Sequence, residues 1–200
     1  MKVNDFLKSK AFKSVMVLMC IALVAGGLLA ILSDVLYVSD QERIERAINT
    51  IYGEEISFEE LELSDSDKTN EYGSIDNVYL LEDENYLIKA TGLHGYKDGT
   101  VTVWIVAEYD KAEFLGLKKV VVASYEKQTL MSSFTNDFYK TFYDSKEDVI
   151  GGKYFAVTES ENNIQNITGG ASKSSNAINN AVDSGLYYVR NVIASDGGEI

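Results

Sequence analysis

A run of 20 uncharged residues from Ser14 to Ser33 constrains this chain more than any other feature. Within it, the stretch 15–32 contains only apolar residues and glycine. An α-helix rises ~1.5 Å per residue, so a helix of this length spans the ~30 Å hydrocarbon layer of a bilayer. The sequence therefore predicts one transmembrane helix, to which we assign residues 14–36.

The charges on the two sides of this run predict its orientation. Lysines dominate the segment before the run and acidic residues follow it: Lys2, Lys8, Lys10 and Lys13 stand against Asp5, while Asp34, Asp40 and Glu42 come after. Positively charged flanks stay on the cytoplasmic side. We therefore expect a single-pass protein of the cell membrane, with a cytoplasmic basic N-terminus over 1–13 and an extracytoplasmic C-terminal part.

A cleaved signal peptide is the competing interpretation of the run. Such peptides have an apolar region of ~7–15 residues that ends in small residues at the cleavage site. Here the run is longer, and its best small-residue group, Val24-Ala25-Gly26, lies in its middle. Met19 is also too large to precede a lipoprotein cysteine, so we interpret Cys20 as a buried thiol within a membrane anchor.

The remaining composition excludes several classes of function. The net charge is −13, and nucleic-acid binding needs a basic surface, so we expect no nucleic-acid partner. The chain has one Cys and one His, which excludes an internal disulfide and a Cys/His zinc site. Chemistry by oxygen nucleophiles or by a borrowed cofactor remains.

After the anchor, the pattern predicts a stalk and an α+β domain. A stalk helix begins at the Ser39/Asp40 cap, carries Ile44 and Ile48 on one face, and ends at Gly53; with its connection it occupies 37–63. A polar loop over 64–73 opens the extracytoplasmic domain, 64–200. Runs rich in Val, Ile, Leu and Tyr, separated by turn residues, predict strands over 78–81, 86–91, 100–108 and 116–123. Their short connections predict an antiparallel sheet, flanked by helices over 130–143 and 174–192.

The segment Asn-Ile-Thr-Gly-Gly-Ala-Ser-Lys-Ser-Ser, 166–175, carries the candidate chemistry. Gly169 and Gly170 permit a tight turn, and Ser172 and Ser174 fall where the last helix begins. Unpaired N–H groups at such a terminus favour a phosphate, so a phosphoester on one of these hydroxyls needs no basic side chain. From local physics alone, an N-cap role for Ser172 or Ser174 is the simpler interpretation. A nucleotide-binding P-loop does not fit, because Ser172 stands where its glycine is required.

The stretch GGASKSSNAINNAV resembles the flavinylation motif of the FMN-binding domain family, Ser/Thr-Gly-Ala-Thr-x-Ser/Thr at the start of a helix. In that family the hydroxyl after Gly-Ala carries FMN through a phosphoester bond. The resemblance implies that Ser172 is the acceptor and that 64–200 is an FMN-binding domain. It also places Gly169, Gly170, Ala171, Ser174 and Ser175 around covalent FMN, and implies no metal site. Asn166 stands where the family usually has Asp.

The order of segments is similar to that in the G subunit of Rnf electron-transport complexes and in the related C subunit of Na⁺-translocating NADH:quinone reductase. These segments are the basic N-terminus, the helix LVAGGLLAILSDVLY, the stretch GLHGYKDGTVTVWIVAEYD and the last helix. The resemblance implies a redox subunit that is not self-sufficient. It would relay electrons among other membrane subunits of a complex that couples ferredoxin/NAD oxidoreduction to Na⁺ or H⁺ translocation. Maturation would need an FAD-dependent flavin transferase with Mg²⁺.

The chain departs from the family pattern at three places. Ser172 replaces the usual Thr, and Gly169 replaces a hydroxyl residue. The family turn Glu-Thr-Pro-Gly-Leu-Gly reads Glu-Lys-Gln-Thr-Leu-Met over 126–131, so Glu126 matches as a flavin-site residue while the Pro and both Gly positions do not. Two alternatives therefore stay open: a noncatalytic extracytoplasmic assembly or binding module that has lost its flavin, and a stand-alone extracytoplasmic flavin reductase.

Aromatic residues recur along the expected helix 130–143, at Phe134, Phe138, Tyr139 and Phe142. Such a stripe could form a platform for a flavin ring. Aromatic residues at helical spacing are more commonly the buried face of a helix, so we expect core packing.

Overall fold

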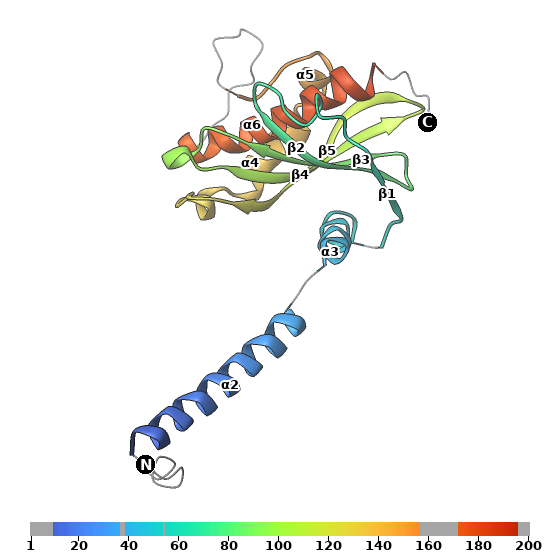
Figure 1. Cartoon of the computed structure of the whole chain (residues 1–200). Coiled ribbons are helices and arrows are strands. Elements are labelled where there is room, and N and C mark those ends of the chain that lie inside the picture. The colour runs from blue at the N-terminus through green and yellow to red at the C-terminus, as the bar shows by residue number, and fades with distance from the viewer. Residues whose placement is uncertain (1–9, 37–38, 54, 157–171, 196–200) are drawn as a thin grey trace. The chain divides into compact units, whose positions relative to one another are not determined.

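The computed structural model of the chain describes residues 10–36, 39–53, 55–156 and 172–195. The chain divides into two compact units, Met1–Ile44 and Glu45–Ile200, which are described separately (Figure 1).

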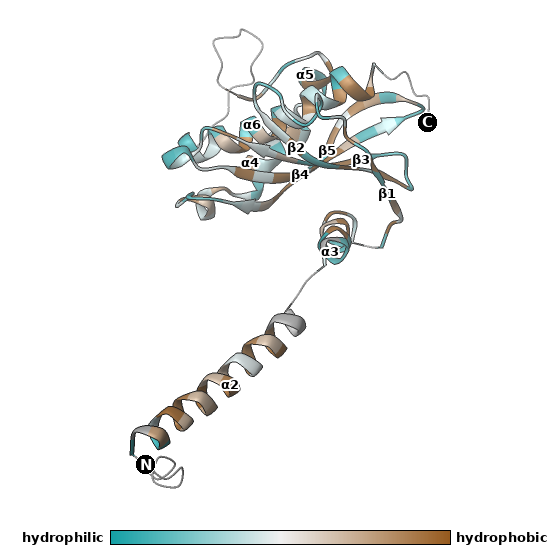
Figure 2. Cartoon of the chain, in the orientation of Figure 1, coloured by the Kyte–Doolittle hydropathy of each residue, from teal (hydrophilic) through white to brown (hydrophobic). Residues whose placement is uncertain are grey.

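The first unit contains the helix α2, Lys10–Leu36. Its segment Phe12–Leu32 is long and apolar enough to cross a membrane, and its large apolar side chains are exposed. Figure 2 shows this helix as hydrophobic along most of its length. The expected apolar N-terminal helix is confirmed, and its length and composition allow a single membrane crossing.

The helix α3, Asp40–Tyr52, forms where the sequence predicts it. The Ser39 side chain accepts a hydrogen bond from the backbone N–H of Glu42 at 3.1 Å, which is N-capping. Gly53 ends the helix with φ of +80°, a conformation that favours glycine. The part of α3 from Glu45 onward belongs to the second unit, within which the expected domain 64–200 lies.

The second unit is built on a five-stranded antiparallel sheet in the order β1-β2-β3-β4-β5. The strands are β1 Phe58–Leu61, β2 Gly73–Leu81, β3 Tyr86–Gly92, β4 Val101–Asp110 and β5 Glu113–Tyr125. The four predicted strands are confirmed, with β2 beginning five residues earlier than 78. The short edge strand β1 was not predicted, because its sequence FEEL has two charged residues in the middle.

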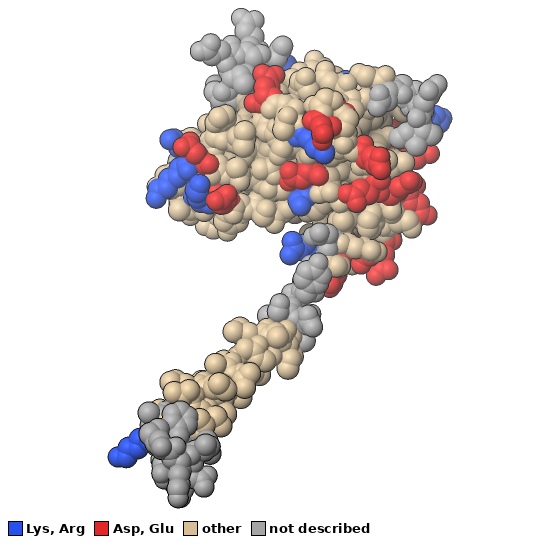
Figure 3. Space-filling view, viewed as in Figure 1, with Lys and Arg blue, Asp and Glu red and all other residues tan. Residues whose placement is uncertain are grey.

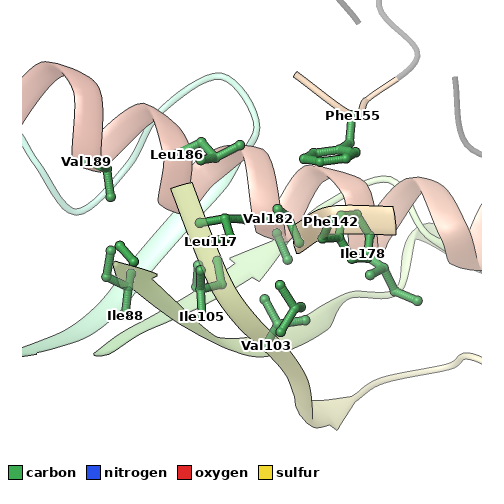
Figure 4. Close-up of a cluster of buried hydrophobic side chains, with 14 of the residues drawn as sticks. Ile88, Val103, Ile105, Leu117, Phe142, Phe155, Ile178, Val182, Leu186 and Val189 are labelled. Atoms are coloured by element: carbon green, nitrogen blue, oxygen red, sulfur yellow. The ribbon is translucent and has the colours of Figure 1, made fainter. Parts of the chain in front are cut away.

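Helices α4, α5 and α6 pack on one face of this sheet. Their apolar side chains form one buried cluster with alternate residues of the strands, and Figure 4 shows Ile178, Val182 and Leu186 of α6 facing Ile88 and Ile105. The helices are α4 Asn136–Asp144, α5 Lys146–Ile150 and α6 Ser172–Tyr188. A short π-helix, η3 Val189–Ile193, follows α6. The α+β fold with flanking helices is therefore confirmed.

The predicted helix 130–143 is wrong at its start. Residues Met131–Ser133 form a short 3-10 turn, η2, and α4 begins only at Asn136 after Thr135 in extended conformation. Ser and Thr side chains compete with helical backbone bonds, which favours turns and caps at this point. The core interpretation of the aromatic stripe is confirmed, because Phe138 and Phe142 are buried and Phe134 and Tyr139 pack against the same cluster.

Candidate functional site

Three segments meet at one end of the sheet, and the side chain of Gln128 joins them. These segments are the loop 93–99 after β3, the turn 126–130 after β5, and the first turn of α6. Gln128 is buried, although it lies in a turn. Its Oε1 accepts hydrogen bonds from the backbone N–H of Tyr96 at 3.1 Å and from the Ser174 hydroxyl at 2.8 Å. Its Nε2 donates to the backbone carbonyl of Glu126 at 2.9 Å.

The local backbone makes room for this amide. Lys127 has φ of +59°, which turns the chain sharply after Glu126 and directs the next residue inward. A Cβ on Gly95 would lie 2.4 Å from Gln128 Nε2, and a Cβ on Gly99 would lie 2.6 Å from it. Only glycine at both positions allows the amide to sit between the loop and the helix.

The candidate acceptor Ser172 is the first residue of α6, and its side chain is exposed. Ser175 is buried, and its hydroxyl donates to the Ser172 carbonyl at 2.9 Å. Ser174 is buried and bonds to Gln128, so its interpretation as an N-cap is wrong. The helix begins at Ser172, two residues earlier than the predicted 174. Ser174 and Ser175 therefore lie inside its first turn.

The other predicted site residues divide into two groups. Glu126 lies at the site, but its side chain is exposed, and its ion pair among the described residues is with Lys127, at 3.8 Å. The group of Glu126 that contributes to the site is its backbone carbonyl, which accepts the hydrogen bond from Gln128 Nε2. The predicted residues Gly169, Gly170 and Ala171 lie outside the described residues.

Helix α6 is fixed against β3 next to this site. A Cβ on Gly92, the last residue of β3, would lie 2.0 Å from the Ala177 carbonyl oxygen, so helix and strand are in direct backbone contact. The Asn180 side chain also donates to the Leu93 carbonyl at 2.8 Å. The first two turns of α6 therefore have a defined place relative to the loop that follows β3.

Exposed apolar side chains surround the same end of the sheet. Outside α2, the described residues include five exposed large hydrophobic residues, and four of them lie here: Leu93, Tyr96 and Leu130 in the loops, and Tyr125 at the end of β5. Tyr125 pairs with Val101 across β5 and β4, on the side of the sheet that carries the helices.

The acidic charge lies mainly at the opposite end of the sheet. Exposed acidic residues occupy the β2–β3 and β4–β5 connections, namely Glu82, Asp83, Glu84, Asp110 and Glu113. Figure 3 shows acidic side chains gathered at the right end of the second unit, whereas its left end carries basic and acidic side chains together. The ten residues of β4 extend about 30 Å, several times the ~8 Å screening length at physiological salt. The acidic connections therefore have little effect on the potential at Ser172.

Two buried polar residues of α6 that sequence analysis missed hold the chain before the candidate motif. Asp183 accepts hydrogen bonds from the N–H groups of Phe155 and Ala156, and Asn179 donates to the Phe155 carbonyl at 3.1 Å. Burial raises the pKa of Asp183 to about 7, while the two N–H groups and Arg190 oppose the shift. The sequence pattern that could have identified them is a pair of polar residues, four positions apart, on an otherwise apolar helix face.

In the described part of the chain, no three His, Cys, Asp or Glu side chains are placed to hold a metal ion. The sequence matches no protein-family model and no curated protein.

Proposed function

We propose that this chain is a membrane-anchored electron carrier with FMN esterified to Ser172. The observation that carries the proposal is the position of Ser172: an exposed hydroxyl at the first residue of a 17-residue helix whose next residues, Ser174 and Ser175, are buried and hydrogen bonded. The resemblance of 169–182 to a flavinylation motif supports the same residue.

The residues around Ser172 fit an FMN phosphoester. The N–H groups of the first helical turn lack carbonyl partners within the helix and favour an anion, by ~0.3–1 kcal/mol at an exposed position. No basic side chain is required to hold the phosphate. The exposed apolar residues Leu93, Tyr96 and Leu130 offer contact surface for a flavin ring.

Attachment of FMN is a group transfer at the Ser172 hydroxyl. Ser172 Oγ forms a bond to the phosphorus of the FMN half of FAD, and the pyrophosphate bond of FAD breaks. AMP leaves with the electron pair of that bond, and the serine proton is released. A separate FAD-dependent transferase with Mg²⁺ carries out this step, so the chain is its substrate.

Bound FMN supplies reversible electron transfer. The protein fixes its point of attachment through α6, and helix α2 anchors the chain with its N-terminus in the cytoplasm and its sheet domain outside the membrane. A covalent link prevents loss of the cofactor from a site open to solvent. The partners are other membrane subunits of an Rnf-type complex, which couples ferredoxin/NAD oxidoreduction to Na⁺ or H⁺ translocation.

Co-expression of the full chain with an FAD-dependent transferase tests this function. We expect the intact mass to increase by FMN less one water, and the flavin fluorescence to survive denaturing electrophoresis. Ser172→Ala should stay bare, whereas Ser172→Thr and the control Ser133→Ala, an exposed serine elsewhere, should be loaded. A bare wild-type chain beside a transferase that loads a known substrate would refute the proposal and leave the assembly module as the better interpretation.

A chain that carries FMN can still be a stand-alone flavin reductase rather than a subunit of a complex. If it passes electrons to a soluble external acceptor at full rate without other subunits, the stand-alone flavin reductase replaces the Rnf-type subunit. If transfer requires the other subunits, the complex is supported.

A further inference from the structure

We propose that Gln128 is the positioning residue that presents Ser172 for esterification. This inference rests on the proposed function and adds a residue that the family resemblance does not supply, because 127–131 is where the chain departs from the family turn. Gln128 does not touch the acceptor hydroxyl. It acts through Ser174, which lies in the same helical turn as Ser172.

The bonding of Gln128 requires an amide. One end of the side chain accepts two hydrogen bonds, from Tyr96 N–H and Ser174 Oγ, while the other end donates to the Glu126 carbonyl. A carboxylate could accept the first two but could not donate the third. Asparagine would be one methylene shorter. A buried amide with all of these bonds made is rigid, and truncation leaves buried groups without partners.

The hydrogen bond between Gln128 and Ser174 restrains the first turn of α6, the turn that contains Ser172. The first turn of a helix frays readily, because its N–H groups lack helical partners. Here the Ser174 hydroxyl ties that turn to a fixed turn after β5, and the Ser175 hydroxyl closes on the Ser172 carbonyl. These two bonds restrain the backbone at Ser172 before the transferase arrives, which lowers the ordering cost of the reaction.

The glycines around Gln128 are an independent observation for the same role. Gly95 and Gly99 both lie so close to Gln128 Nε2 that any side chain at either position would displace the amide. The loop 95–99 is held closed by a hydrogen bond from Gly95 N–H to the Gly99 carbonyl at 2.9 Å. The loop, the turn and the helix are thus all hydrogen bonded to the Gln128 amide. Ser172 is the exposed serine in the helical turn that this amide contacts.

Two measurements on the full chain test this inference. The first is amide hydrogen exchange over 172–176 in the bare protein. The second is the rate of FMN transfer at several concentrations of the chain. Loss of one hydrogen bond changes an equilibrium about fivefold, so Gln128→Ala and Ser174→Ala should each speed exchange and lower kcat/KM of transfer by about that factor. The double variant should be no worse than the more affected single variant, because both substitutions remove the same bond.

A pH profile separates positioning from general destabilisation. Gln128→Glu has the shape of the native side chain, and its protonated form can again donate to the Glu126 carbonyl. Its transfer rate relative to wild type should therefore recover as pH falls, whereas that of Gln128→Ala should not. The control Thr129→Ala, an exposed neighbour, should match wild type in both measurements.

The outcomes distinguish this inference from the proposed function. If wild type is loaded and both Gln128→Ala and Ser174→Ala are loaded at the wild-type rate, the role of Gln128 is overturned and the function stands. If folded Ser174→Ala exchanges as slowly as wild type, the role is also overturned. If wild type stays bare, both proposals fail together.

Discussion

The backbone N–H of Phe155 donates to both carboxylate oxygens of Asp183, at 2.8 Å to one and 3.1 Å to the other. The same carboxylate accepts a third bond, from Ala156 N–H, at 2.5 Å. Asp183 lies in the middle of α6 and is completely buried. One helix therefore holds both the chain at 155–156 and the first turn that begins at Ser172.

The pKa of Asp183 makes stability depend on pH. Burial raises the pKa to about 7, well above the ~3.9 of an unfolded chain. The folded state therefore binds this proton more tightly, and its stabilising effect is complete below pH ~4 and lost as pH rises to about 7. We expect the free energy of unfolding to fall over this range. Urea unfolding followed by the fluorescence of Trp104, the single tryptophan, measures it.

Asp183→Asn should remove this pH dependence. It should also cost about 2 kcal/mol at low pH, because the amide NH₂ faces backbone donors and leaves one of them unpaired. Asp76→Asn, on the exposed surface, is the matched control and should keep the wild-type profile. An unchanged slope in Asp183→Asn would show that other groups produce it.

The difference between Gly53 and Gln128 shows what the sequence could predict. The stop of α3 at Gly53, the strands β2 to β5 and the aromatic face of α4 follow from local patterns, and the structure confirms them. Gln128 is different, since its partners Tyr96 and Ser174 lie 32 and 46 residues away. No local pattern encodes that meeting, because it arises only when the ends of β3 and β5 and the start of α6 lie at the same place.

Other features missed in the sequence have similar causes. The strand β1 is a four-residue edge strand, too short and too charged for a period-two pattern to be recognised. Asp183 and Asn179 were hidden in a helix defined by its apolar residues, although their four-residue spacing places them on one face. The assignment of Ser172 as acceptor stays a prediction, and it came from the family resemblance rather than from periodicity.

The second half of α3 should be required for the stability of the sheet domain. Ile48 is almost completely buried, and Lys119 of β5 donates to the carbonyls of Thr50 and Ile51 at 3.2 and 3.1 Å. Ile48→Ala should therefore lower the free energy of unfolding by about 3 kcal/mol. Asn49→Ala, exposed on the same helix, should change it by less than about 0.5 kcal/mol. Equal stability of the two variants would mean that α3 is only a connection.

The contact between β3 and α6 should not tolerate a methyl group. A Cβ on Gly92 would lie 2.0 Å from the Ala177 carbonyl oxygen and 2.2 Å from the Ala181 nitrogen, both backbone atoms. Gly92→Ala should therefore push the helix from the sheet and cost about 3 kcal/mol. Gly152→Ala is the control: nothing lies within 4 Å of its Cβ, and only its φ of +92° opposes alanine, at about 1 kcal/mol. Thermal unfolding of the two variants should separate them clearly.

The guanidinium of Arg190, in η3, joins the chain after α6 to α5 and to the segment that follows α5. It donates to the carbonyls of Val149, Gly152 and Lys153, and it lies 4.4 Å from the ring centre of Tyr154. Arg190→Lys keeps the charge but cannot reach several carbonyls from one plane. We expect it to cost about 2 kcal/mol in the free energy of unfolding, the range for hydrogen bonds from charged groups.

Substitution of Arg190 should also move the pH dependence set by Asp183. Arg190 lowers the pKa of Asp183 by its charge, so Arg190→Met should raise that pKa further, while Arg190→Lys should largely preserve it. Because the stabilising proton is then held to higher pH, stability should continue to fall above pH 7 in Arg190→Met. The measurement is the Trp104 unfolding curve as a function of pH. The same midpoint in both Arg190 variants would show that the charge does not act on Asp183, leaving burial as the cause of its raised pKa.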